Sequence, residues 1–221
     1  MNKIRLLLAD DHTIVRQGLI DLLTRYDDIN VVTEAKSGEE MVEKYFSFHP
    51  DVVLSDIEMP GLNGIEAAIK IFDRDPDAKI IFLTMYNSDE YIYKAFQIKA
   101  SGIIPKEIIK NELADVIRAV ASGRKYFMGK SEEELNNINK KFNELMKSHR
   151  TRALTLTPSE KQILFLIAEG KSTIEIAKET SKTKRTIDTM RSNMMGKLNI
   201  KSLPLFIKYA IQYSFFNKNK L

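Results

Sequence analysis

The chain has no cysteine among its 221 residues, which excludes disulfides, thiol nucleophiles and thiolate metal sites. It also has no apolar run near the roughly 20 residues that a membrane-spanning helix needs. The N-terminus reaches the acids Asp10 and Asp11 too early for a signal peptide. We therefore expect a soluble, cytoplasmic protein that has no membrane partner.

Charge is distributed unevenly along the chain, which has a net charge of +4. Residues 152–221 contain 13 Lys and Arg against 5 Asp and Glu, so this part carries +8 and the remainder carries −4. The length is large for one average domain and suits two small ones. The basic part favours a polyanion as partner, although a solvated basic face would give the same count.

Residues 1–123 alternate between apolar runs and amphipathic segments, which predicts five strands, each followed by a helix. Parallel strands need helical crossovers, and these bury both faces of the sheet. The expected fold of this part is therefore α/β, with a doubly wound five-stranded parallel sheet. The strands are predicted near residues 4–9, 29–35, 51–55, 79–84 and 102–104, and the helices at 12–25, 39–48, 63–72, 88–99 and 107–122.

Polar side chains follow four of these strands. Asp10 and Asp11 come after the first strand, Asp56 after the third, Thr84 at the end of the fourth and Lys106 after the fifth. A single acid after an apolar run is usually a cap of the strand or turn. The carboxyl ends of parallel strands meet at one edge of a sheet, however, so we expect these side chains to form a cluster.

Such a cluster has a chemical use. Three close carboxylates repel one another unless a cation neutralises them, and a hard divalent ion such as Mg²⁺, or alternatively Mn²⁺, fits this set. An Asp carboxylate can attack phosphorus and form an acyl phosphate. Lys106 would pair with the oxygens of the transferred group, and the Thr84 hydroxyl would donate a hydrogen bond to it.

Residues 3–123 resemble the receiver domain of two-component response regulators. The resemblance rests on Asp10-Asp11, Asp56 followed by Met59-Pro60-Gly61 and Gly64, Leu83-Thr84, and Lys106. It implies a flavodoxin/CheY-like fold in which Asp56 accepts phosphate from a sensor histidine kinase, while Thr84 and Lys106 contact the phosphoryl group. It also implies a Mg²⁺ site formed by Asp11, Asp56 and the backbone carbonyl of Glu58, with Asp10 binding directly or through water.

Three positions differ from the usual pattern of that family. Ile103 stands where a switch aromatic is common, so an inward swing of Tyr or Phe is not available there. Pro105 precedes Lys106, whereas many relatives have proline after that lysine. Met85 follows Thr84 where small residues are common, and its longer side chain would slow access to Asp56.

Residues 124–154 form a predicted linker that is partly helical. Ser131 and Glu134 have the spacing of a capping box, and the apolar residues that follow lie on one helical face: Leu135, Ile138, Phe142, Leu145 and Met146. This face either packs on the chain's own domains or forms a short dimer contact. Residues 149–155 are predicted to be a hinge.

Residues 155–221 are predicted to form an all-α domain. Thr157, Pro158 and Glu160 mark a helix start, a short helix follows near 173–179, and Thr183 caps a third helix that extends to about Leu198. Two helices joined by a tight turn are the helix-turn-helix arrangement, whose second helix enters the major groove of DNA.

The third helix of this part has two distinct faces. Ile187, Met190, Met194 and Leu198 are expected in the core. The other face carries donors and cations that suit phosphates and base edges. Asp188 would accept from cytosine at best, because phosphates repel it. The candidate DNA-binding residues are Lys184, Arg185, Thr186, Asp188, Thr189, Arg191, Ser192 and Lys197.

Residues 153–218 look like the LuxR-type helix-turn-helix domain that ends regulators of the NarL/FixJ class. The matching residues are Leu156-Thr157 with Glu160, Ala168-Glu169-Gly170, Glu175-Ile176-Ala177, Thr186-Ile187 and Lys197-Leu198. The resemblance implies binding to double-stranded promoter DNA and a homodimer in the active state. The last helix, residues 203–216, would carry the dimer contact in such domains, or would pack in the core.

Three hypotheses follow. The first is a transcription regulator controlled by phosphorylation at Asp56, with no enzymatic activity beyond Mg²⁺-dependent self-phosphorylation and slow autodephosphorylation. The second is a DNA-binding regulator that does not need phosphate and uses its receiver as a dimerisation scaffold. The third is a phosphohydrolase similar to haloacid dehalogenases, with Asp56 as nucleophile and Glu58 as acid.

Overall fold

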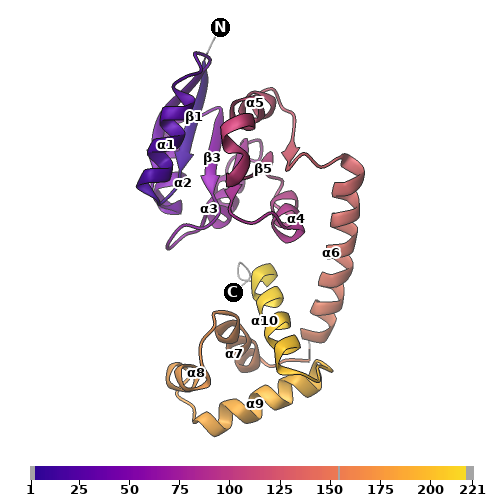
Figure 1. Ribbon diagram of the computed structural model, residues 1–221. Helices are drawn as coiled ribbons and strands as arrows, with labels where there is room; N and C mark the ends of the chain where they lie inside the picture. Colours follow the sequence, from indigo (N-terminus) through magenta and orange to yellow (C-terminus); the bar gives the residue numbers. More distant parts are fainter. Residues whose placement is uncertain (1–2, 154, 218–221) are drawn as a thin grey trace. The chain divides into compact units, whose positions relative to one another are not determined.

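The computed structural model describes residues 3–153 and 155–217 (Figure 1). The chain forms two compact units, Met1–Lys140 and Lys141–Leu221. The boundary between the units lies inside one helix, α6 (Glu132–Ala153), whereas the sequence divides the chain at residues 123 and 154. The division into receiver, linker and DNA-binding domain stays a prediction.

The first unit contains a parallel sheet of six strands in the order β2-β1-β3-β4-β5-β6. Every residue of β3, β4 and β5 is buried, as expected for parallel strands covered on both faces. The doubly wound α/β prediction is therefore confirmed. The strands are β1 (Ile4–Ala9), β2 (Ile29–Ala35), β3 (Val52–Asp56), β4 (Ile80–Thr84), β5 (Gly102–Pro105) and β6 (Tyr126–Phe127).

Five helices cover this sheet. Two of them, α1 and α5, share a buried cluster with Leu6, Leu8 and Leu54. Leu7 and Val53 alternate with these residues and are also fully buried, so they face the opposite side of the sheet and need the cover of the other helices. The helices are α1 (Thr13–Leu23), α2 (Gly38–Phe48), α3 (Gly64–Phe72), α4 (Asp89–Gln97) and α5 (Ile109–Ala121).

Sequence reasoning missed the sixth strand. The two residues of β6 lie in the predicted linker, and they pair in parallel with β5, Tyr126 beside Gly102 and Phe127 beside Ile103. Two residues are too few to show the alternation that marks a strand. The pairing depends on the free edge of β5, which only the folded sheet provides. The prediction of a five-stranded sheet is thus one strand short.

The linker helix α6 begins where the sequence predicts. Ser131 and Glu134 form the expected capping box, because each side chain accepts from the backbone N–H of the other residue. The predicted hinge at residues 149–155 is wrong over most of its length, since α6 continues to Ala153. Residue 154 lies outside the described residues. Without Gly or Pro, nothing in that segment stops the helix earlier.

The second unit is helical and has its own core. Ile187, Met194 and Leu198 are fully buried and Met190 packs against them in part, as predicted for one face of α9. On α10, Phe206 and Ala210 are fully buried, whereas Ile211 is half exposed, so one face of this helix packs in the core. The helices are α7 (Pro158–Ala168), α8 (Thr173–Glu179), α9 (Lys184–Lys197) and α10 (Leu203–Asn217).

Among the described residues, no helix combines the length and the apolar character that crossing a membrane requires.

Substitution of Gly64, the first residue of α3, tests how tightly the loop after β3 is packed. A Cβ there would lie 2.0 Å from the carbonyl oxygen of Asp56 and 2.8 Å from the Ser55 hydroxyl. We expect Gly64→Ala to lower the free energy of unfolding by about 2 kcal/mol through overpacking. Gly18→Ala in α1 is the control, because nothing lies within 4 Å of its Cβ, and it should stabilise by about 0.5 kcal/mol. Chemical denaturation of both variants measures this, and equal stability for Gly64→Ala and wild type would contradict it.

Candidate functional site

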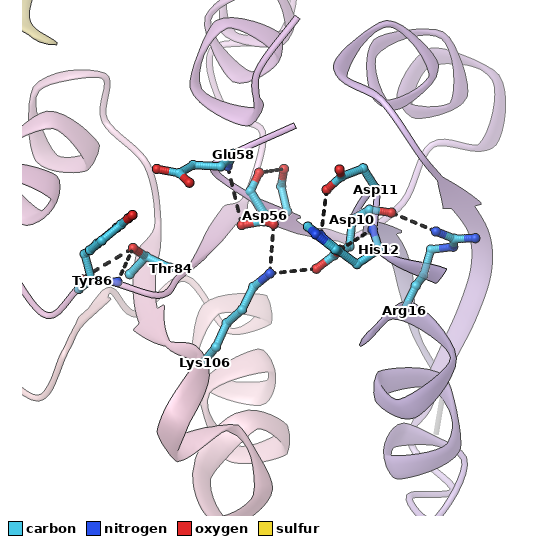
Figure 2. A network of polar contacts seen from close by, with 10 residues as sticks. Asp10, Asp11, His12, Arg16, Asp56, Glu58, Thr84, Tyr86 and Lys106 are labelled. Carbon is cyan, nitrogen blue, oxygen red and sulfur yellow. Dashed lines mark hydrogen bonds and ion pairs between the residues drawn. The ribbon is translucent and has the colours of Figure 1, made fainter. Parts of the chain in front are cut away.

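The carboxyl ends of β1, β3 and β4 hold the predicted cluster (Figure 2). Asp56 is the last residue of β3 and aligns with Leu83 of β4, so the Thr84 side chain follows on the neighbouring strand. These residues are buried although they are polar: Asp10 is 0 % exposed, Thr84 2 % and Asp56 4 %. Buried carboxylates need compensating partners.

Lys106 supplies such a partner. It follows β5 directly and begins a short 3₁₀ turn (Lys106–Ile108). Its Nζ lies 2.9 Å from Asp10 Oδ2 and 2.8 Å from Asp56 Oδ2. Burial raises the pKa of Asp56 above its usual range, against the opposing effect of the Lys106 ammonium. Burial alone would lower the pKa of Lys106, but hydrogen bonds to Asp56 and Asp10 raise it overall.

A divalent cation fits the residues beside this ion pair. Ligand atoms of Asp10, Asp11, His12 and Asp56 all lie within 4.8 Å of one another. Asp11 Oδ1 is buried without a hydrogen-bond partner, and its near neighbour is His12 Nδ1 at 3.0 Å. A hard cation such as Mg²⁺ prefers oxygen ligands. These carboxylates provide such ligands, and the unpaired Asp11 oxygen would gain a partner when the ion binds. The sequence prediction did not include His12, whose position directly after the acid pair places it beside this cluster.

Glu58 has a different surrounding from the other predicted metal ligands. Its backbone N–H donates to Asp56 Oδ1 at 3.4 Å, so its main chain lies beside the cluster. Its side chain accepts a hydrogen bond at 3.1 Å from the hydroxyl of Tyr91 on α4. The metal prediction concerns the Glu58 carbonyl, and it stays a prediction.

The Thr84 hydroxyl is engaged with its own loop. The backbone N–H of Tyr86 donates to Thr84 Oγ1 at 3.0 Å, and Oγ1 lies 3.4 Å from the Tyr86 carbonyl oxygen (Figure 2). A pocket of about 280 Å³ lies beside these groups and is lined by Asp56, Thr84, Met85 and Lys106, among others. Met85 is 65 % exposed at this pocket, and its influence on access to Asp56 stays a prediction.

The basic face of α9 is largely exposed. Two of its predicted DNA contacts have partners inside the unit. The Nζ of Lys197 lies 2.9 Å from both carboxylate oxygens of the buried Glu160, and Arg191 Nη1 donates to Thr173 Oγ1 at 2.7 Å. The predicted residues that the structure leaves exposed are Lys184, Arg185, Thr186, Asp188, Thr189, Ser192 and Lys197, of which Lys197 has the partner Glu160.

Glu160 joins two helices. Its backbone N–H and side chain form a capping box with Thr157 at the start of α7, and its carboxylate binds Lys197 at the end of α9. Burial acts to raise the pKa of Glu160, but the hydrogen bonds from Lys197 and Thr157 outweigh it, and the pKa lies below its usual range.

Removal of the Lys106 charge predicts a pH-dependent loss of stability. Lys106→Met leaves two buried carboxylates unpaired, so without divalent ions the free energy of unfolding at neutral pH should fall by about 3 kcal/mol. The pKa of Asp56 is already raised in the fold, so the folded carboxyl binds a proton more tightly than the unfolded one, and acidification should shrink the loss. Denaturation at several pH values measures this. Lys44→Met is the control, because Lys44 pairs with the more exposed Glu40, and equal losses in both variants would contradict the prediction.

The Glu160–Lys197 pair predicts acid sensitivity of the second unit. A carboxyl with a lowered folded pKa adds stability above its unfolded pKa, near 4.5, and this contribution disappears as the pH falls through the folded pKa. Glu160→Gln keeps an acceptor for the helix cap and should cost about 1 kcal/mol at neutral pH, since Lys197 is partly solvated. Denaturation followed through amide resonances of α7 and α9 should show a weaker acid dependence in the variant. Parallel pH curves for both proteins would refute this role.

Two family models match the chain. One is the response regulator receiver domain, over residues 6–118, and the other is the luxR family of bacterial regulatory proteins, over residues 154–210. The two matches fall on the two parts of the chain for which the sequence showed a resemblance to these families.

Known proteins match the chain over nearly its whole length. The chain is 34 % identical over 214 residues to the oxygen regulatory protein NreC of Staphylococcus carnosus, which covers 94 % of this chain and 97 % of that protein. Among solved structures, the response regulator RcsB of Salmonella typhimurium matches with a TM-score of 0.57 and 26 % identity, over 94 % of this chain and 98 % of that one. The response regulator ChrA of a heme-sensing two-component system matches with a TM-score of 0.53 and 28 % identity, over 97 % of this chain and 100 % of that one.

These matches agree with the strand-end cluster of the first unit and the helix-turn-helix of the second. The chain therefore belongs to the response regulators of two-component systems that join a receiver domain to a LuxR-type DNA-binding domain.

Proposed function

We propose that Asp56 is the residue that a sensor histidine kinase phosphorylates, and that the phosphoryl group controls DNA binding by the second unit. The observation that carries this proposal is the contact of one ammonium group, Lys106, with two buried carboxylates, Asp10 and Asp56. A buried ion pair is weak evidence for a stabilising role, so a chemical role explains its place at the strand ends better.

The transfer would be a displacement at phosphorus. A carboxylate oxygen of Asp56 attacks the phosphorus of the donor's phosphohistidine, the P–N bond breaks, and the imidazole leaves with the bond's electron pair. The product is an acyl phosphate on Asp56. Lys106 remains protonated, since its pKa is raised, and donates to an oxygen of the transferred group. The Thr84 hydroxyl gives up the hydrogen bond that it donates to the Tyr86 carbonyl and donates to the phosphoryl group instead.

Mg²⁺, or Mn²⁺ in its place, would be held by Asp10, Asp11, Asp56 and the carbonyl of Glu58, with His12 close by. When bound, the ion neutralises negative charge on the transferring group. The buried Asp11 oxygen without a hydrogen bond supports this assignment.

The output would be binding to promoter DNA in the cytoplasm. The exposed residues of α9, led by Lys184 and Arg185, would contact phosphates, with Thr189 and Ser192 near base edges. Lys197 and Arg191 would contribute less, because each has a partner within the unit. For the related RcsB, a complex with DNA and a structure of two dimers on two parallel DNAs are known. By analogy we propose a homodimer in the active state.

One observation favours a second candidate, the regulator that does not need phosphate. Residue 103 is an isoleucine and is 0 % exposed, so this position has no aromatic side chain that could move as a switch. The phosphohydrolase hypothesis is disfavoured, since the family assignment speaks against it and Tyr91 binds the carboxylate of Glu58.

Phosphorylation and DNA binding can be tested together. The full chain is incubated with acetyl phosphate and Mg²⁺, phosphate incorporation is measured by intact mass, and DNA affinity is measured on genomic fragments at fixed salt. We expect Asp56→Asn to incorporate no phosphate, and wild type to bind promoter fragments at least about tenfold more tightly after phosphorylation, as a population shift of more than 1.4 kcal/mol gives.

Two outcomes would change the assignment. Equal incorporation by wild type and Asp56→Asn would exclude Asp56 as acceptor. Incorporation at Asp56 with unchanged DNA affinity would favour the regulator that does not need phosphate.

A further inference from the structure

Two tyrosines form a stacked pair beside the candidate phosphorylation site. Tyr86 lies in the loop that follows β4, and Tyr91 lies in α4. Their ring centroids are 5.5 Å apart and the ring planes differ by 4°. Tyr86 is 51 % exposed, so burial of its ring does not explain its position. The stack therefore holds the loop after β4 against α4.

Each tyrosine is also joined to a residue of the site. The Tyr86 backbone N–H donates to the Thr84 hydroxyl at 3.0 Å, and the Tyr91 hydroxyl donates to Glu58 Oε1 at 3.1 Å. Glu58 in turn donates its N–H to Asp56 Oδ1 at 3.4 Å. Figure 2 shows Asp56, Glu58, Thr84 and Tyr86 in the same region of the first unit, and the first three of them line the pocket. These contacts form a continuous path from Asp56 to Thr84 that passes through α4.

Charge supports the direction of the central hydrogen bond. Burial, together with the nearby Glu58 carboxylate, raises the pKa of the Tyr91 hydroxyl above its usual value. The hydroxyl thus keeps its proton at neutral pH and donates to Glu58. A hydrogen bond to a charged acceptor is stronger than one between neutral groups.

The other end of α4 contacts the linker helix. Gln97 Nε2 donates to Asn139 Oδ1 of α6 at 2.7 Å, and both residues belong to the first unit. Helix α4 is therefore attached near its start to the site, through Tyr91, and at its last residue to α6. Helix α4 has only nine residues. We therefore expect that a release of its start, at Tyr91, changes the contact of its last residue, Gln97, with Asn139.

We propose that Tyr86 and Tyr91 form a latch that holds the Thr84 hydroxyl and α4 in the resting arrangement, and that this latch opens when a phosphoryl group on Asp56 takes the Thr84 hydroxyl. This inference rests on the proposed function of Asp56. The Tyr86 carbonyl and the phosphoryl group compete for Thr84, because Thr84 has one hydroxyl proton and it faces the Tyr86 carbonyl oxygen at 3.4 Å. Tyr91 is thus a positioning residue, which acts on the site through Glu58.

The latch predicts that its loss makes the active arrangement easier to reach. A contact made only in the resting state lowers the population that binds the phosphoryl group, and its removal raises the apparent affinity for that group. Tyr91→Phe keeps the ring and its stack but removes the hydroxyl. We expect the half-saturating concentration of beryllofluoride, a phosphoryl mimic, to fall about fivefold in this variant, as the loss of one hydrogen bond allows.

The experiment titrates beryllofluoride with Mg²⁺ into the full-length wild type, Tyr91→Phe and Tyr126→Phe, and follows the amide resonances of residues 84–97 and 132–139. Tyr126→Phe is the matched control. It loses the hydrogen bond of 2.6 Å that the Tyr126 hydroxyl donates to Glu112, and neither residue belongs to the path. The control should titrate like wild type. In Tyr91→Phe, resonances of α4 and of residues 132–139 should already move toward their bound positions without ligand.

Each outcome decides the proposal. A fivefold fall in Tyr91→Phe alone supports the latch. Equal half-saturation in all three proteins, or equal shifts in both variants, overturns it while Asp56 keeps its proposed role. If wild type does not respond to beryllofluoride, the proposed function of Asp56 fails, and the latch fails with it.

Discussion

The contact of the Lys106 ammonium with the carboxylates of Asp10 and Asp56 is the constraint on which the rest of the first unit depends. It joins the ends of β1, β3 and β5, which are far apart in the sequence. The three groups are mostly buried, so the pair is costly to form unless the chain positions them closely. The parallel sheet does so, because every strand of the cluster ends at the same edge.

Residues outside the cluster serve this geometry. Gly64 allows α3 to start in contact with the backbone of Asp56, and Arg16 Nη1 donates to the Asp10 carbonyl at 2.8 Å. The Glu160–Lys197 pair does the same work in the second unit, where it fixes the end of α9 to the start of α7. In both units a charged pair with a buried carboxylate positions an element of the proposed function, the strand ends around Asp56 in the first unit and α9 in the second.

The sequence predicts the features that depend on local pattern, such as the strands, the helices and the polar residues at strand ends. Asp10, Asp11, Asp56, Thr84 and Lys106 were predicted at strand ends because apolar runs stop there, and the parallel sheet then brings four strand ends together. The bonds of Glu58 to Tyr91 and of Lys197 to Glu160 join residues 33 and 37 positions apart, which no periodicity predicts. Likewise β6 exists only through its neighbour, and the end of α6 was misplaced because no residue there stops a helix.

The short strand β6 has a consequence for self-association. Without it, β5 would be the edge strand and would expose unpaired backbone N–H and C=O groups. Exposed edges of this kind can pair with strands of other molecules. Tyr126 and Phe127 occupy this margin, and the left-handed backbone of Met128 and Gly129 turns the chain away directly afterwards. The first unit thus ends this side of its sheet with a strand of two residues, and so short an edge strand limits pairing with strands of other molecules.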